Sequence, residues 1–239
     1  MFSLVSPMLA YQLKKVPAIK YGDAKENPDR EAVPVEAVQY ALAYFPATIA
    51  DMLRLQLLTA MRPSEIRLML VGYIRQKYDG ENWLYLPPAH KTAWRGKKKA
   101  IVLGVEEQEI LRKYIQDKPS DKPIFLNSRG NPYTASRYST IVRKTIAKYD
   151  LVKFIPYQLR HTSLTQISVE HGKDAARAVA GHSSEVVTSI YDHSDVQKAQ
   201  KVVNARNARY RQVGSVQVGS VQELPVVPFL RIFKGGDQL

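Results

Sequence analysis

The pattern of apolar and polar positions predicts a chain that is mostly helical. After Pro34, VEAVQYALAYF has apolar residues at helical spacing. A second helix fits 47–60, where four apolar residues fall on one face: Ile49, Met52, Leu53 and Leu57. Pro63 and Glu65 then mark a helix start, with proline at the first position and an acid in the first turn. Arg62 is therefore expected at a helix junction, where its side chain can point into a cleft.

The stretch from residue 82 predicts a small sheet. NWLYL and AIVL are short runs rich in aromatic and β-branched residues, and they flank the basic stretch PPAHKTAWRGKKK. This arrangement is typical of a β-hairpin with a long, positively charged tip. A helix fits EEQEILRKYIQ, a short IFL strand follows between loops bounded by prolines, and residues 134–148 are again predicted to be helical.

Further helices are predicted in the C-terminal part. One begins after Pro156, covers YQLRHTSLTQISVEH and ends at Gly172. Shorter helices fit DAARAVA and SEVVTSIY, and a longer polar one runs from about Asp195 to Arg211. The predicted fold class is mainly α with a small antiparallel β-sheet (α+β). In the tail, VGSVQ occurs twice in tandem before an apolar end broken by prolines, which fits either a docking strap or a disordered terminus.

Composition excludes several classes of protein. The 239 residues are 45% hydrophobic and 24% charged, as in an ordinary globular protein, and they include no cysteine. A disulfide framework, a thiolate nucleophile and a cysteine zinc site are therefore excluded. No apolar run reaches the roughly 20 residues that span a bilayer. The opening MFSLVSPMLAYQL makes a poor signal peptide, so a cytoplasmic location is predicted.

The charge balance favours a polyanionic partner. The chain has 35 basic and 22 acidic residues, a net charge of +13. Such an excess favours nucleic acid ahead of an anionic membrane, although a merely solvated basic surface is the alternative. The charge is concentrated in residues 90–99, which read HKTAWRGKKK, and in 198–211, which hold five basic residues and no acid.

Common catalytic motifs are missing. The chain has no GxSxG, no GxxxxGK[ST] and no HExxH, and no tight cluster of Asp or Glu suggests a magnesium site. Metal-free chemistry without a cofactor is therefore predicted, carried by arginine, lysine, histidine and tyrosine. Two arginines can hold the oxygens of a phosphodiester, a tyrosine phenol can attack phosphorus, and lysine or imidazole can transfer protons.

Four segments resemble, in chain order, the motif boxes of the tyrosine recombinases, which include phage integrases and XerC/XerD-like site-specific recombinases. These segments are TAMRPSEI (59–66), PYQLRHT (156–162), AGHSS (180–184) and IYDH (190–193). The resemblance covers roughly residues 34–211. It implies an arm or linker at 1–33, a tyrosine recombinase catalytic domain at 34–212 and a tail at 213–239 that is flexible or docks in trans.

The resemblance assigns a role to each matching position. Arg62 and Arg160 take the places of the two catalytic arginines, and Glu65 is the acidic residue that supports the first. His182 matches the later His/Trp position and Tyr191 the nucleophile. Lys91, which follows the first strand of the hairpin, best matches the catalytic lysine, although three further lysines lie on the same hairpin: Lys97, Lys98 and Lys99.

This sequence departs from the family pattern at two positions. Tyr157 stands where the family has the first histidine of HxLRH, and a phenol can donate a hydrogen bond to phosphate but is a poor base near neutral pH. Ala60 replaces the glycine of TGxR, which matters only where that residue needs a positive φ. Tyr157 is interpreted as tuning the site and is retained among the catalytic residues.

The resemblance implies a recombinase that acts in DNA integration and recombination, as part of a mobile genetic element. It would cleave and rejoin strands through a 3′-phosphotyrosyl intermediate, as a homo-tetramer on double-stranded DNA, with no metal and no membrane. A type IB topoisomerase-like activity and a non-cleaving DNA-binding remnant are the alternatives. The family's N-terminal clamp domain would not fit into about 33 residues, so weak site preference is expected.

Overall fold

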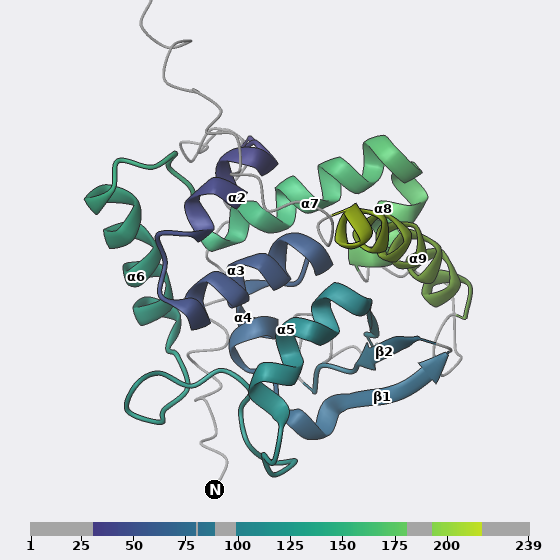
Figure 1. Cartoon of the computed structure of the whole chain (residues 1–239), viewed down its shortest axis with the longest axis horizontal. Helices are drawn as coiled ribbons and strands as arrows, with labels where there is room; N and C mark the ends of the chain where they lie inside the picture. The colour runs from purple at the N-terminus through teal and green to yellow at the C-terminus, as the bar shows by residue number, and fades with distance from the viewer. Residues whose placement is uncertain (1–30, 80, 89–98, 181–192, 217–239) are drawn as a thin grey trace, which may run out of the picture. The chain divides into compact units, whose positions relative to one another are not determined.

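The computed structural model describes residues 31–79, 81–88, 99–180 and 193–216. Contacts divide the chain into two units, Met1–Glu31 and Ala32–Leu239, and the described residues belong almost wholly to the second. Its elements are helices and one three-stranded sheet (Figure 1), so the predicted fold class is confirmed. In this part of the chain, no helix combines the length and the apolar character that crossing a membrane requires.

The first helices follow the predicted boundaries closely. They are α2 (Val35–Leu42), α3 (Ala47–Thr59) and α4 (Pro63–Arg67). Proline precedes α2 and α3 at the N-cap and opens α4 at its first position, where a missing N–H costs no intrahelical hydrogen bond. More of α3 is buried than a single apolar face predicts, because other helices surround it, and even Gln56 and Thr59 are buried.

The sheet contains one strand that the sequence pattern did not predict. A 3₁₀ turn at Val71–Tyr73 leads into β1 (Ile74–Asp79), which pairs antiparallel with β2 (Asn82–Tyr85), and β2 pairs antiparallel with β3 (Ile101–Leu103). The polar edge strand IRQKYD lacks the apolar alternation of a half-buried strand, so pairing with β2 places it rather than its own pattern. The predicted IFL strand is wrong, since of its three residues only Leu126 pairs, in an isolated bridge with Pro132.

Five further helices complete the described part of the chain. They are α5 (Val105–Ile115), α6 (Ala135–Lys148), α7 (Pro156–His171), α8 (Lys173–Ala180) and α9 (His193–Val216). Thr134 caps α6 by accepting a hydrogen bond from the Arg137 amide at 3.2 Å. Gly172 ends α7 with φ of 86°, a value that glycine adopts without strain. The predicted SEVVTSIY helix lies outside the described residues.

The main core gathers around α3, which lies among α2, α4, α5 and α7 (Figure 1). Its fully buried apolar side chains include Ile49, Met52, Leu53 and Leu55, which meet residues of the sheet and of α5, α6 and α7. The C-terminal end of α3 therefore lies deep in the molecule. The chain that follows it, with Arg62, starts from a position fixed on several sides.

Candidate functional site

Arg62 leaves the end of α3 at a sharp reversal of the chain. Ala60 adopts the left-handed conformation, with φ of 53° and ψ of 22°, and its amide donates to the Gln56 carbonyl oxygen at 2.9 Å. Arg62 is then extended, and α4 begins at the next residue. The predicted helix junction is confirmed. The positive φ also means that the alanine in place of the family glycine carries backbone strain.

Glu65 is the acceptor at the centre of the site. Its carboxylate accepts hydrogen bonds from the Arg62 backbone amide at 2.8 Å and the Arg62 guanidinium at 3.1 Å. The Lys99 ammonium donates to both carboxylate oxygens, at 2.9 and 2.8 Å. Burial opposes ionisation of this carboxyl, but Lys99 and Arg62 outweigh it, and the pKa of Glu65 lies below its ordinary value. Glu65 is therefore the charged partner that fixes Arg62.

Lys99 is the hairpin lysine that reaches this site in the described part of the chain. It comes two residues before β3, and its side chain is only 3% exposed. Burial disfavours its charged form and lowers its pKa to about 8; Glu65 acts in the opposite sense, and Arg160 and Arg62 add to the lowering. Lys99 was one of three alternatives to Lys91, and sequence spacing alone gave no means of identifying the buried one.

Arg160 enters the site from the first turns of α7. Its guanidinium is buried and donates to the Ala60 carbonyl oxygen at 2.5 Å and to the Ala180 carbonyl oxygen at 3.0 Å. Burial lowers its pKa from the ordinary value, and Arg62 does so as well. Two segments far apart in sequence, the turn after α3 and the end of α8, are thus joined by one arginine.

The described site has an excess of positive charge. Arg62, Lys99 and Arg160 are cationic and only Glu65 is anionic, so the four groups sum to +2 when Lys99 is protonated. The three cations influence one another electrostatically, as the lowered pKa values of Lys99 and Arg160 show. A buried cluster with more cations than anions favours an external anion. The arrangement is suited to binding a phosphodiester.

Tyr157 occupies the first turn of α7, on the rim of this cluster. Its side chain is 44% exposed, whereas Arg160, three residues on, is buried. The phenol lies close enough to influence the pKa of Arg160. An exposed hydroxyl at this position can donate a hydrogen bond to an incoming phosphate oxygen.

The other predicted residues, Lys91, His182 and Tyr191, lie outside the described residues, as do Lys97 and Lys98. The structure therefore brings together Arg62, Glu65, Lys99 and Arg160, with Tyr157 beside them. Two described elements border the remaining positions in sequence. Ala180, whose carbonyl oxygen accepts a hydrogen bond from Arg160, comes two residues before His182. Helix α9 begins two residues after Tyr191.

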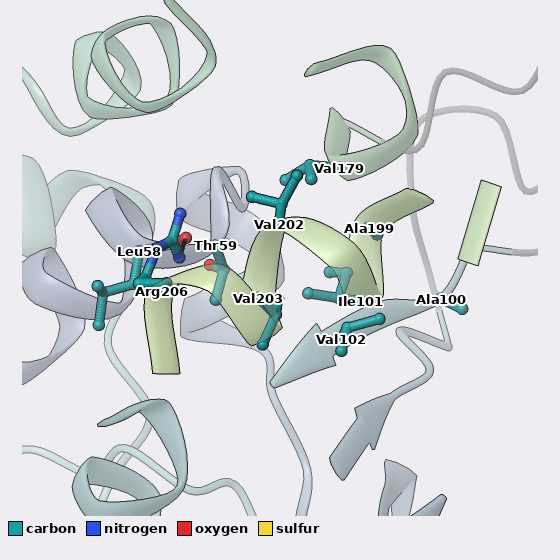
Figure 2. Close-up of a pocket in the computed structure, with 10 residues that line it drawn as sticks. All are labelled: Leu58, Thr59, Ala100, Ile101, Val102, Val179, Ala199, Val202, Val203 and Arg206. Carbon is teal, nitrogen blue, oxygen red and sulfur yellow. Dashed lines mark hydrogen bonds between the residues drawn. The ribbon is translucent and has the colours of Figure 1, made fainter. Parts of the chain in front are cut away.

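Helix α9 packs against the elements that carry the site. Figure 2 shows its apolar side chains next to β3 and the end of α3, around a hollow of about 10 Å³, which is lined by Leu58, Thr59, Ala100, Ile101, Val102, Val179, Ala199, Val202, Val203 and Arg206. A hollow of this size holds a water molecule at most. Arg206 of α9 also donates to the Leu58 carbonyl oxygen and, at 3.2 Å, to Glu107. Helix α9 is thus anchored against β3 and the end of α3.

Helix α6 presents a basic surface. Its buried side chains are Tyr138, Val142 and Ile146, and its sequence contains no acidic residue. The exposed basic side chains are Arg137, Arg143, Lys144 and Lys148. The Arg67 guanidinium donates to the Tyr133 carbonyl oxygen at 2.8 Å, which ties the chain before α6 to α4. A cationic face is therefore connected to the helix that follows Arg62.

The chain is similar to known XerC tyrosine recombinases. XerC of Actinobacillus pleuropneumoniae is 30% identical over 125 residues, which are 49% of this chain and 41% of that protein. XerC of Haemophilus ducreyi is 28% identical over 175 residues, 70% of this chain and 55% of that protein. The chain thus spans about half the length of these two relatives.

The fold is also that of solved recombinases. XerA recombinase aligns with a TM-score of 0.53 at 14% identity, over 81% of this chain and 71% of that chain. A lambda integrase dimer bound to a core site aligns with a TM-score of 0.52 at 19% identity, over 71% of this chain and 64% of that chain. The model of the phage integrase family matches residues 33–198. This match shows that the chain belongs to the phage integrase family.

Proposed function

We propose that this chain cleaves and rejoins DNA through a 3′-phosphotyrosyl intermediate, as a site-specific recombinase. Membership of the phage integrase family supports recombination of DNA as the general activity. The observation that carries the finer proposal is a cluster of three cations, in which Arg62 and Lys99 donate to the Glu65 carboxylate and the buried Arg160 lies close enough to interact with it electrostatically. Fixed positive charge at this place would stabilise the charge that develops on a pentacoordinate phosphorus.

The proposed reaction conserves the phosphoester bond. The Tyr191 phenol loses its proton and attacks phosphorus, the bond from phosphorus to the 5′ oxygen breaks, and the 5′ oxygen takes up a proton. The product is a 3′-phosphotyrosine and a free 5′ hydroxyl. Attack of a 5′ hydroxyl on that phosphotyrosine reverses the step and restores both the DNA strand and the phenol. No oxidant, reductant or cofactor is needed for this balance.

Each site residue has a part in this proposal. Arg62 and Arg160 hold the non-bridging oxygens, and Glu65 fixes Arg62 from behind. His182 and Tyr157 donate hydrogen bonds to the same phosphate. Lys91 supplies the proton to the leaving 5′ oxygen.

Lys99 is suited to a different task from Lys91. Its ammonium is almost fully buried and donates to both carboxylate oxygens of Glu65, so its charge is engaged by Glu65 and not exposed at the surface of the site. A group in that position acts on the phosphate through Glu65 and through its charge. We therefore keep Lys91 as the proposed acid and assign Lys99 a positioning role.

The partner we propose is double-stranded DNA. The net charge of +13 and the basic face of α6 both favour a polyanion. The lambda integrase and the Tn1549 transposon integrase, which aligns with a TM-score of 0.54 at 17% identity, were both solved with DNA. We extend this partner to the present chain.

Covalent trapping tests the reaction. The protein is incubated with supercoiled plasmid in EDTA, quenched with detergent, digested with nuclease and examined by mass spectrometry. A nucleotide adduct on Tyr191 that is lost in Tyr191→Phe is the expected result, whereas Tyr149→Phe, which changes another tyrosine, keeps the adduct. DNA binding without any adduct, even on nicked DNA, would instead favour the non-cleaving remnant.

We further propose that residues 34–212 act as the catalytic domain and that four copies assemble on two DNA duplexes. Strand exchange requires two cleaved duplexes held together, which a single copy cannot supply. Mass photometry of the Tyr191→Phe protein with duplex DNA would show a species with four protein chains.

A further inference from the structure

A buried glutamine connects the two segments that carry Arg62 and Arg160. Gln56 lies on the last turns of α3 and is fully buried. Its side-chain amide donates to the Met61 carbonyl oxygen at 3.2 Å and to the Pro156 carbonyl oxygen at 3.2 Å. Met61 directly precedes Arg62, and Pro156 opens the helix that carries Arg160. One side-chain nitrogen thus contacts both segments, which lie about 100 residues apart.

The same amide has a third partner on α6. The Tyr138 hydroxyl donates to the Gln56 side-chain oxygen at 2.8 Å, and Tyr138 is also fully buried. The side chain of Gln56 therefore uses its oxygen and its nitrogen at once. A polar group in a dry core that is paired on every side is held in one orientation, because any other orientation leaves buried groups unpaired.

These hydrogen bonds close a ring with Arg160. The Arg160 guanidinium donates to the Ala60 carbonyl oxygen, and the Ala60 amide donates to the Gln56 carbonyl oxygen. Pro156 lies one helical turn before Arg160, so the ring returns to Gln56 through α7. The turn before Arg62 and the first turn of α7 are therefore held to one another at two points, through Gln56 and through Arg160.

We propose that Gln56 is a positioning residue that sets the spacing and orientation of the two arginines for the phosphate. The proposal deepens the function proposed above and rests on it. The interior of α3 would ordinarily take an apolar side chain at so buried a position, and a glutamine there is useful only because it meets three polar partners. The reacting phosphate must contact both guanidinium groups at once, so a small shift of one segment costs rate more than it costs DNA affinity.

The test compares Gln56→Met with a control that weakens the core elsewhere. Methionine has similar size and removes all three hydrogen bonds. Ile146→Ala truncates a core side chain of α6 that makes none of them. We expect Gln56→Met to lower the rate of covalent complex formation at saturating DNA by about 100-fold. The Kd of Gln56→Met for the duplex should change by less than about threefold. Ile146→Ala should change the rate of covalent complex formation by less than about threefold.

Hydrogen exchange provides a second readout that does not depend on cleavage. In Gln56→Met, the peptides covering 57–66 and 153–162 should exchange faster than in the unsubstituted protein and in Ile146→Ala. Unchanged exchange in both peptides would overturn the proposal. So would a cleavage rate that falls no further than in Ile146→Ala.

The two proposals fail in different ways. If the unsubstituted protein forms no adduct, the proposed reaction is wrong, and hydrogen exchange still shows whether Gln56 joins the two segments. If Gln56→Met does not fold, Tyr138→Phe removes the α6 contact alone and Gln56→Asn shortens the side chain by one methylene. We expect Gln56→Asn to lower the rate and Tyr138→Phe to leave it within about threefold, because the bonds to Met61 and Pro156 remain. Equal rates in both would overturn the proposal.

Discussion

Replacing Lys99 by methionine is the sharpest test of the buried charge cluster. The substitution keeps the length of the side chain and removes the two hydrogen bonds to Glu65, at 2.8 and 2.9 Å. Glu65 is 1% exposed, so its carboxylate cannot turn to solvent for compensation. Removing one partner of a buried ion pair costs about 3–5 kcal/mol. Because Arg62 still contacts Glu65 at 3.1 Å, we expect the lower end of this range, about 3 kcal/mol.

The assay is urea unfolding at pH 7, followed by circular dichroism, on four proteins of a double-mutant cycle. These are the unsubstituted chain, Lys99→Met, Glu65→Gln and the double variant. Because each single variant leaves a buried charge without its partner, the double variant should lose less stability than the two single losses combined. We expect a coupling energy of about 2 kcal/mol. Lys113→Met is the matched control, because Lys113 is 59% exposed and makes a surface ion pair with Asp51 at 3.4 Å. This substitution should lower the free energy of unfolding by less than about 1 kcal/mol.

A stabilising role of the buried pair is refuted if Lys99→Met is no more destabilising than Lys113→Met. An additive cycle would refute it as well, because the two groups would then not act as a pair. A change in the denaturant slope would point to a different unfolded state rather than to the lost pair.

Three further predictions concern pH, backbone strain and DNA. Burial puts the pKa of Lys99 at about 8 in the folded protein, below its ordinary value of 10.5, so between pH 8 and pH 10 the unfolded chain binds more protons. We therefore expect the difference in unfolding free energy between the unsubstituted chain and Lys99→Met to rise with pH, by up to about 1.4 kcal/mol per pH unit. A difference that does not change with pH in urea titrations would contradict this. Ala60 has φ of 53°, so Ala60→Val should lower the free energy of unfolding by at least about 2 kcal/mol. Ala60→Gly should change it by less than about 1 kcal/mol, because relief of backbone strain offsets the loss of a buried methyl group. Equal thermal midpoints for the two variants would show that the positive φ does not matter. Arg143→Ala and Lys144→Ala should each weaken binding to any duplex and reduce the salt slope by about 1, while Lys122→Ala, beside Asp121, should leave both unchanged in fluorescence anisotropy.

Local signals in the sequence were enough for most of the helices. Prolines at helix starts, an N-cap threonine and the glycine at the end of α7 act within one or two turns, so the boundaries of α3, α4, α6 and α7 could be predicted from them. The order of the four motif boxes likewise indicated the family, and the placement of Arg62 at a helix junction was confirmed. The polar strand β1 was missed because nothing in its own residues predicts a strand.

The role of each lysine and glutamine could not be decided locally. Lys91, Lys97, Lys98 and Lys99 share one basic stretch, and their spacing says nothing about which ammonium is buried. The contact between Lys99 and Glu65 joins residues 34 apart in the chain. It exists only because the fold brings the segment before β3 to α4. Burial then lowers the pKa of Lys99, whereas Lys99 and Arg62 lower the pKa of Glu65 against the effect of burial.

The sequence by itself determined the helical character, the residue types of the site and their order along the chain. These depend on propensity, capping and spacing, which act between near neighbours. The tertiary structure decided that Ala60 takes a positive φ, that Arg160 reaches the Ala60 and Ala180 carbonyl oxygens, and that Gln56 joins the turn before Arg62 to α7. Such contacts span up to about 100 residues and gain their strength from burial, because hydrogen bonds and charges removed from water must find their partners within the fold.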